Sequence, residues 1–305
     1  MLAIIIPYFK LTFFEATLQS LANQTDKRFK VYIGDDASPE NPNDLLSRYK
    51  GQFDYVYHRF ENNLGGTSLT QQWDRCIALS GNEEWIMILG DDDVLVENVV
   101  EVFYDKYAEF NDKTNLIRFA SKQINEKTKI DSEIFTHPRW EKSSDFYIKK
   151  QKGLVRSSLS ECVFLRMVYS KYGFRNYPLA WHSDDLAWIE FADSKLVYAI
   201  NEAVVEFRMS FENISGKNTN LKEKAIAELC FKRDLLSEKL HFFTNIQKLS
   251  LLMSFEYCLK NNREVLFKEW LLLLKYYINI GHVIPFFKCI RRMVVYYSKS
   301  LILNC

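Results

Sequence analysis

The sequence predicts an α/β protein in which a mostly parallel central sheet is flanked by helices and followed by a C-terminal helical extension. In the first half of the chain, short apolar segments rich in isoleucine and valine alternate with segments whose apolar residues have helical spacing. This alternation indicates crossover units on a parallel sheet. From about residue 220 the pattern is helical to the end. We therefore expect two domains, residues 1–215 and residues 216–305.

The elements of the first domain can be placed in chain order. Ala3–Phe9 is a short apolar run typical of a buried strand, and Thr12 is expected to cap the helix that follows it. Residues 122–160 are polar and read as irregular. The other elements are expected as strands at 29–34, 53–60, 84–90, 115–121, 195–200 and 203–210, and as helices at 67–80, 96–110 and 161–174.

Composition limits the class of protein. The chain has 305 residues, of which 48% are hydrophobic, so it can bury a large core. Its net charge of +1 provides no overall field for nucleic acid, and we expect no such partner. The six cysteines form no CxxC pair, which fits reduced thiols in a cytoplasmic protein. The N-terminal segment lacks the basic region of a signal peptide, and no apolar stretch reaches the roughly 20 residues that span a bilayer.

Acidic residues cluster where two predicted strands end. Asp35–Asp36 and Asp91–Asp93 follow apolar segments, and the carboxyl ends of parallel strands share the edge of a sheet where ligands bind. Adjacent carboxylates raise each other's pKa, and a hard divalent cation such as Mg²⁺ or Mn²⁺ would offset their repulsion. The alternative is that the triplet is a solvated turn and that Asp35–Asp36 caps the turn that follows it.

A third acidic pair lies in an apolar setting. Asp184–Asp185 is flanked by Trp181 and Trp188. We expect partial burial to raise the pKa of a carboxyl group there, which would suit it to proton abstraction. The alternative is an acidic helix N-terminus, which the helix dipole favours.

Five of these segments together resemble a known family. In their order and spacing, "IIIPYFK", "FKVYIGDDAS", "NNLGG", "EWIMILGDDDVL" and "SDDLAW" resemble the inverting family 2 glycosyltransferases, which have the GT-A fold, a Rossmann-like sheet. The resemblance runs from Leu2 to about Phe110, resumes at Glu161 and fades after Gly216, roughly two-thirds of the chain. It implies an enzyme that moves a sugar from a nucleotide-sugar, a UDP-sugar, to a hydroxyl group of a polysaccharide or lipid-linked glycan.

The resemblance implies a nucleotide site at the first strands. Asp36 matches the family aspartate that accepts a hydrogen bond from the uracil N3–H group, and Pro7 and Tyr8 match residues that line the base pocket. Gly65 lies in the turn after the third predicted strand. A glycine lets the backbone approach a ligand closely, although a plain tight turn would also use one.

The resemblance also implies a bound Mn²⁺ or Mg²⁺ ion. Asp93 matches the metal-coordinating acid, and Asp91 or Asp92 matches the residue near the ribose and the metal. Asp93 and Asp91 are expected to hold the metal. A glycine replaces the first acid of the family motif, so which of Asp91 and Asp92 contacts the ribose stays open. Arg208 is expected to neutralise phosphate or to form a strand-end ion pair. Ser210 stands where the family often has a histidine near the metal.

The resemblance implies that the pair Asp184–Asp185 contains the catalytic base. Asp185, with Asp184 beside it, matches the catalytic base. One base without an enzyme nucleophile implies inversion at the anomeric carbon. Trp181 or Trp188 is expected to stack on a sugar ring, or both belong to the core. His182 is expected to form a wall of the acceptor site or to lie on the surface.

The C-terminal segment has the composition of a membrane-surface helix, and the sequence also bears on two functions other than sugar transfer. Residues 270–305 contain no acidic residue and mix aromatic, aliphatic and basic residues at helical spacing. Such a helix suits the surface of an anionic membrane, which would place the protein at the inner face of the cell membrane, or it packs on the catalytic domain. A catalytically impaired module that binds sugar-nucleotides or glycans stays open. Nucleotidyl transfer is disfavoured, because the first strand lacks a glycine- and lysine-rich phosphate loop.

Overall fold

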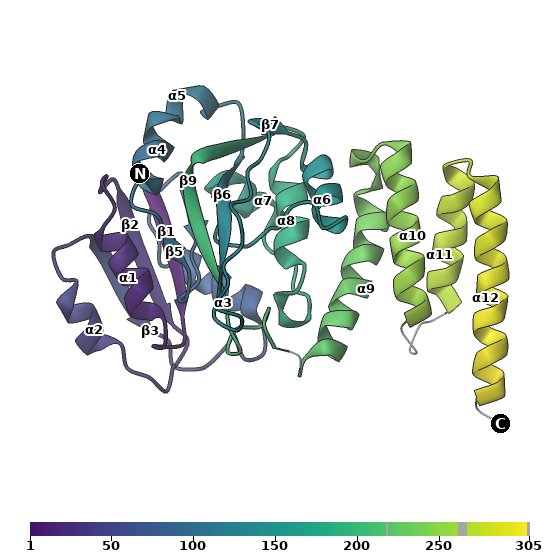
Figure 1. Ribbon diagram of the computed structural model, residues 1–305, viewed down its shortest axis with the longest axis horizontal. Helices are drawn as coiled ribbons and strands as arrows, with labels where there is room; N and C mark the ends of the chain where they lie inside the picture. The colour runs from purple at the N-terminus through teal and green to yellow at the C-terminus, as the bar shows by residue number, and fades with distance from the viewer. Residues whose placement is uncertain (218, 262–266, 304–305) are drawn as a thin grey trace. The chain divides into compact units, whose positions relative to one another are not determined.

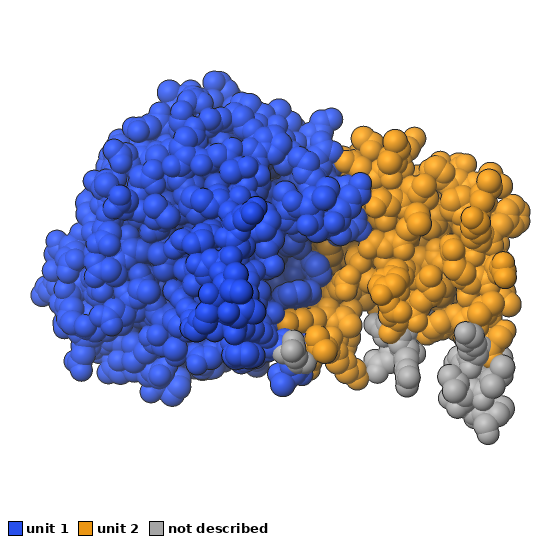
Figure 2. Space-filling view, viewed as in Figure 1, with its two compact units in different colours: residues 1–220 blue, residues 221–305 orange. Residues whose placement is uncertain are grey.

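The computed structural model describes residues 1–217, 219–261 and 267–303. The chain divides into two compact units, residues 1–220 and residues 221–305, which Figure 2 distinguishes by colour. The first unit contains the sheet with its flanking helices, and the second is helical. The predicted α/β fold with a C-terminal helical extension is therefore confirmed.

The first unit is built on a mixed sheet. In the described residues its strands follow the order β3-β2-β1-β4-β8-β6-β9-β5, with β7 also paired to β9 (Figure 1). The pairs β1–β2, β2–β3, β1–β4 and β6–β9 are parallel, and the pairs of β8, β5 and β7 are antiparallel. The strands are β1 (Leu2–Tyr8), β2 (Phe29–Asp35), β3 (Asp54–Arg59), β4 (Trp85–Ile88), β5 (Val94–Leu95), β6 (Leu116–Asn125), β7 (Trp140–Glu141), β8 (Cys162–Leu165) and β9 (Val197–Met209).

Helices flank this sheet, and a serine side chain marks the start of one of them, α3. Ser68 begins α3 because its side chain accepts a hydrogen bond from the amide of Gln71. The strands β1 and β4 are almost wholly buried, which is why they read as continuous apolar runs without alternation. The helices of this unit are α1 (Phe14–Ala22), α2 (Asn43–Arg48), α3 (Leu69–Ile77), α4 (Val99–Asp105), α5 (Tyr107–Phe110), α6 (Ser143–Gln151), α7 (Arg166–Tyr172) and α8 (Ser183–Phe191).

Four expectations about these elements were wrong. Thr12 does not cap α1, whose N-cap residue is Phe13 and has no side-chain cap hydrogen bond. The helix expected at 161–174 is the strand β8 followed by α7, because Cys162–Leu165 is buried between β4 and β6 in the middle of the sheet. A buried four-residue strand and a buried helix have no distinguishing periodicity. The two strands expected at 195–200 and 203–210 are one strand, β9, whose pairing with β6 shifts register after Ile200. Residues 122–160, expected to be irregular, contain the end of β6, all of β7 and α6.

The second unit is a row of antiparallel helices in which each packs on the next, as Figure 1 shows. Its interior contains fully buried aromatic side chains, including Phe231, Phe255 and Trp270. Among the described residues, no helix has the length and apolar character needed to cross a membrane. The four helices are α9 (Leu221–Glu238), α10 (Asn245–Asn261), α11 (Phe267–Asn279) and α12 (Val283–Leu303).

Candidate active site

One cleft of the first unit collects polar side chains from five segments of the chain. Its volume is about 460 Å³. The segments are the loop after β4, the helix α6, the connection between α6 and β8, the turn and first residues of α8, and the end of β9 with the turn after it. Among the residues singled out in the sequence, the cleft is lined by Asp92, Asp93, Trp181, His182, Asp184, Asp185 and Arg208.

Asp93 is the most enclosed member of the acidic triplet. Its side chain accepts hydrogen bonds from the amide of Arg208, at 2.8 Å, and from the hydroxyl of Ser160. Burial, followed by the negative charge of Asp92, raises the pKa of Asp93 to about 7. The carboxylate is therefore oriented by fixed donors but lacks enough positive charge to stabilise its ionised form.

Asp91 and Asp92 turn in different directions. Asp91 accepts hydrogen bonds from the amides of Phe9 and Lys10, at 2.8 and 2.9 Å, and so joins the loop after β4 to the end of β1. Burial, with the charge of Asp92, raises the pKa of Asp91 to about 6. Asp92 faces the cleft, and burial raises its pKa as well. Asp91, which we expected to be the second metal ligand, is therefore not among the residues that line the cleft, whereas Asp92 is.

The acidic triplet has the chemistry of a cation site without a complete ligand set. Within the described residues, no three side chains of His, Cys, Asp or Glu are grouped as metal ligands. The three carboxylates nevertheless have raised pKa values, so added positive charge would stabilise them. They offer hard oxygen donors next to an open cleft, where phosphate and water could supply the remaining ligands. These residues therefore fit Mg²⁺ or Mn²⁺.

Arg208 and Ser210 organise the end of β9 beside the triplet. The guanidinium of Arg208 donates to the carbonyl oxygen of Asp92, at 2.9 Å, and forms an ion pair with Glu126. The expected strand-end ion pair is thus present in the lining of the cleft. The hydroxyl of Ser210 accepts from the amides of Glu212 and Asn213, at 3.1 and 3.3 Å, and builds the following turn.

Asp185 is held from two sides at the start of α8. Its Oδ1 atom lies 2.5 Å from Lys150 Nζ, and its Oδ2 atom lies 2.7 Å from His182 Nδ1. Burial alone would raise the pKa of Asp185, but the Lys150 ammonium and the hydrogen bond from His182 together hold it below the usual range. Our expectation of a raised pKa was therefore wrong for Asp185. It is correct for Asp184, whose pKa burial raises.

The turn before α8 has an unusual backbone. Leu179, Ala180 and His182 have positive φ angles of 59°, 51° and 70°. Non-glycine residues in this region cost of order 1 kcal/mol each, and such residues gather at functional sites. Here the turn aims His182 at Asp185 and places Trp181 in the wall of the cleft.

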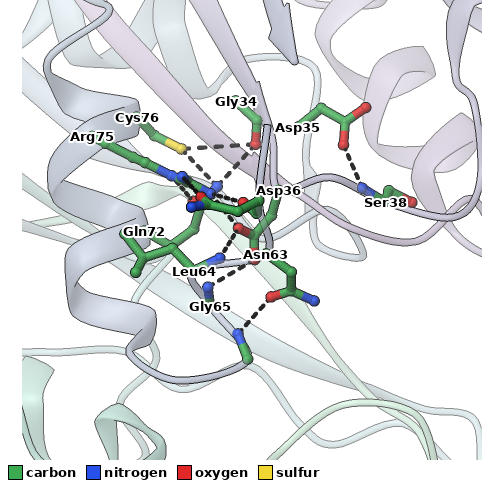
Figure 3. A network of polar contacts seen from close by, with 12 residues as sticks. Gly34, Asp35, Asp36, Ser38, Asn63, Leu64, Gly65, Gln72, Arg75 and Cys76 are labelled. Atoms are coloured by element: carbon green, nitrogen blue, oxygen red, sulfur yellow. Dashed lines mark hydrogen bonds and ion pairs between the residues drawn. The ribbon is translucent and has the colours of Figure 1, made fainter. Parts of the chain in front are cut away.

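Asp36 lies at the end of β2, in the network that Figure 3 shows. Its carboxylate accepts from the amides of Leu64 and Gly65, at 2.7 and 2.9 Å, and forms an ion pair with Arg75. Burial raises the pKa of Asp36 despite these partners. Gly65 is needed here, because an added Cβ atom would lie 2.5 Å from the Asp36 side chain. Asp35, the last residue of β2, is also buried and pairs with a different arginine, Arg59.

Tyr8 and Pro7 lie at the end of β1. The ring of Tyr8 is fully buried, with its centroid 4.6 Å from that of Phe14, and its hydroxyl donates to the carbonyl oxygen of Glu40, at 2.8 Å. Tyr8, which we expected to line a base pocket, therefore supports the strand end from within the core. Pro7 is partly exposed.

Several residues of these networks escaped the sequence analysis. Lys150 lies in the region that looked irregular, and nothing in its local pattern links it to Asp185, 35 residues away. Arg75 is on the polar side of α3 and resembles any exposed helix residue. Ser160 precedes β8, whose strand was not recognised. The one usable signal was a count of charge, because two acidic pairs and one acidic triplet require cations from elsewhere in the chain.

Comparisons with known proteins concern the family and the fold of this chain. A family model described as Glycosyl transferase family 2 matches residues 3–174. A comparison with curated protein sequences finds no match. The crystal structure of S. aureus TarS 1–349 in complex with UDP-GlcNAc aligns with a TM-score of 0.63 at 14% identity, over 92% of this chain and 80% of that chain. The same fragment in complex with UDP aligns with a TM-score of 0.61 at 13% identity, over 92% and 81%. A longer TarS structure aligns with a TM-score of 0.60 at 14% identity, over 92% of this chain and 48% of that chain. These alignments confirm the predicted GT-A fold.

Proposed function

The chain belongs to glycosyl transferase family 2, as its motifs predict, and from this premise we propose that it transfers a sugar from a UDP-sugar to an acceptor hydroxyl group with inversion. The observation that carries the proposal is the cleft, in which Asp92, Asp93, Arg208 and the Asp184–Asp185 pair face the same space. A leaving diphosphate needs positive charge and an attacking hydroxyl needs a base, and the cleft provides candidates for both.

The nucleotide is proposed to bind at the end of β2. Asp36 already accepts three hydrogen bonds, so a carboxylate with about four acceptor positions keeps one for the N3–H group of uracil. TarS has the same fold and was crystallised with UDP-GlcNAc and with UDP, which supports a UDP-sugar as the donor.

A divalent cation is proposed to bind at the acidic triplet. Asp93 and Asp92 would hold it from the cleft side, while Asp91 fixes their loop to the end of β1. The ion would stabilise negative charge on the leaving diphosphate. The donors to Asp93, Ser160 Oγ and Arg208 N, fix the direction of its carboxylate before any ligand arrives.

Asp185 is the proposed base. Its lowered pKa keeps it ionised at neutral pH, so that one carboxylate oxygen can take the proton of the acceptor hydroxyl. The hydroxyl oxygen attacks the anomeric carbon as it loses this proton. The bond to the diphosphate breaks in the same step, which inverts the configuration. Lys150 and His182 are positioning residues, because they hold the two oxygens of Asp185.

One observation favours a second candidate. Both oxygens of Asp185 have partners, and Ser210 binds backbone amides of its own turn. A module that binds sugar-nucleotides without turning them over would have these features. Release of UDP in the presence of acceptors separates the two candidates, since the binding module would bind UDP and release none from a UDP-sugar.

The acceptor is proposed to be a glycan or a lipid-linked glycan that enters beside Trp181 and His182. We also propose that residues 270–305 contact a membrane, which would bring the enzyme to a lipid-linked acceptor.

Calorimetric titration tests the donor proposal. UDP should bind in the presence of Mn²⁺, and EDTA should weaken it by at least tenfold. ADP, GDP and CDP serve as controls. Equal binding of all four nucleotides, or binding of UDP that is indifferent to EDTA, would contradict the proposed donor or the proposed cation, respectively.

A further inference from the structure

The second unit contains a cavity whose lining is mainly cationic. Its volume is about 650 Å³, and it is lined by Lys260 of α10 and by residues of α12. The α12 residues that line it are Lys288, Arg291, Arg292, Val295 and Tyr296. Four of the six lining residues are therefore basic. None of them takes part in the cleft of the first unit.

The positive charge of this cavity is largely unbalanced. Buried Glu256 lies 2.9 Å from a terminal guanidinium nitrogen of Arg292 and 3.8 Å from Lys260 Nζ. Within residues 219–261 and 267–303, neither Lys288 nor Arg291 forms an ion pair. Glu256 thus pairs with two of the four cations, Arg292 and Lys260, and a single carboxylate cannot balance all four. An unpaired group of this kind attracts an anion.

Apolar side chains are exposed on the same face of α12. Ile284 is 69% exposed and Phe287 is 62% exposed. They precede Lys288 and Arg291 by one turn of helix, at the spacing that places residues on one face. Val294, which is 54% exposed, follows on the next turn. Figure 1 shows α12 at the end of the row of helices. This surface therefore presents cations and apolar groups together.

We propose that this cavity binds the phosphate group of an anionic phospholipid at a bilayer surface, while Ile284 and Phe287 enter the boundary between headgroups and acyl chains. Lysine and arginine are the side chains that bind phosphate oxygens by charge-assisted hydrogen bonds. A soluble phosphate compound would account for the cations but not for the exposed apolar residues. An interfacial helix accounts for both.

This inference specifies the membrane contact proposed for residues 270–305 and does not depend on sugar transfer. Binding to vesicles and release of UDP are separate measurements, so either can fail while the other succeeds.

The test uses the full chain and sedimentation with vesicles of phosphatidylcholine that contain phosphatidylglycerol as about one third of the lipid. The variant Lys288→Gln/Arg291→Gln removes two exposed, unpaired charges. Each basic residue near an anionic surface contributes about 1 kcal/mol, or roughly fivefold, so we expect a loss of vesicle affinity of about 30-fold. Vesicles of phosphatidylcholine alone should bind weakly.

A matched control removes the same charge elsewhere in the unit. Lys268→Gln/Lys275→Gln alters two exposed residues of α11 that do not line the cavity, and we expect a loss of at most a few-fold. Ile284→Ser/Phe287→Ser should also weaken vesicle binding with its charges intact. Unchanged thermal unfolding would show that the variants are folded.

Three results would each overturn the proposal. The first is that the wild-type chain fails to sediment with anionic vesicles, and the second is that both charge variants lose the same vesicle affinity. The third is that vesicles do not bind, while sodium pyrophosphate raises the unfolding temperature of the wild type but not of Lys288→Gln/Arg291→Gln. That outcome would assign the cavity to a soluble phosphate compound.

Discussion

Replacing Lys150 with methionine should change both the stability of the first unit and the titration of Asp185. Lys150 Nζ lies 2.5 Å from Asp185 Oδ1, and the exposed fractions of the two side chains are 25% and 3%. Removing one partner of a buried ion pair costs about 3–5 kcal/mol. Because Lys150 is partly solvated and His182 still holds the other oxygen, we expect a loss of about 2–3 kcal/mol in the free energy of unfolding at neutral pH.

The stability difference between Lys150→Met and the wild type should depend on pH, because the substitution changes the folded-state pKa of Asp185. In the wild type the folded-state pKa of Asp185 is lowered, so its stabilising contribution is present above the unfolded-state pKa and is lost as pH falls through the folded-state pKa. Without Lys150, only His182 opposes the effect of burial, so the folded-state pKa of Asp185 rises. As pH falls through this higher folded-state pKa, the stability of Lys150→Met relative to wild type should therefore increase.

Urea unfolding at a series of pH values measures this difference, and the adjacent lysine supplies the control. Lys149 is on the same helix and pairs with Glu141, which does not line the cleft. Lys149→Met should lose stability without this recovery at low pH. If turnover can be measured, the acidic limb of kcat/KM should also move to higher pH in Lys150→Met alone. Identical pH profiles for the two variants would refute the role given to Lys150.

Two further predictions concern the cation and the nucleotide. Mn²⁺ at about 100 times its Kd should stabilise the wild type by about 2.7 kcal/mol, raising the unfolding temperature by roughly 5–10 °C, because it binds the folded triplet. Asp93→Asn should remove this shift, and an equal shift in the variant would contradict the assignment of Asp93. Gly65→Ala would bring a Cβ atom within 2.5 Å of the Asp36 side chain, so we expect a loss of about 1–3 kcal/mol in stability and about tenfold in UDP affinity by calorimetry. Unchanged UDP affinity would separate Asp36 from the nucleotide site.

The fold could be predicted where one residue pattern has one structural meaning. The runs that became β1, β2 and β4 are short, apolar and followed by polar turns, so the sequence located them well. The strand β8 could not be predicted in this way, because its four residues are buried between two other strands and have neither alternation nor helical spacing. The register shift within β9 also depends on its partner β6, which no local pattern describes.

In the candidate site, too, some residues could be predicted from the sequence and others could not. The acidic clusters stood out because they lie at strand ends and near tryptophans, and the family resemblance singled out Asp93 and Asp185 within them. The structure places both residues in one cleft. The partners that tune them come from far along the chain. Lys150 and Ser160 are unremarkable in sequence, and their function arises only from tertiary contacts with the two acids. For this reason the direction of the Asp185 pKa shift could not be predicted from its apolar neighbours.

The most direct test of the central claim is the release of UDP by Asp185→Asn. With Mn²⁺ and a set of UDP-sugars and acceptors, the wild type should release UDP, and the variant should be slower by about 10²–10⁴-fold, the contribution typical of a general base. UDP affinity measured by calorimetry should stay within a few-fold of the wild type, because Asp185 does not contact the nucleotide in the proposed arrangement. Full turnover by Asp185→Asn would contradict the account.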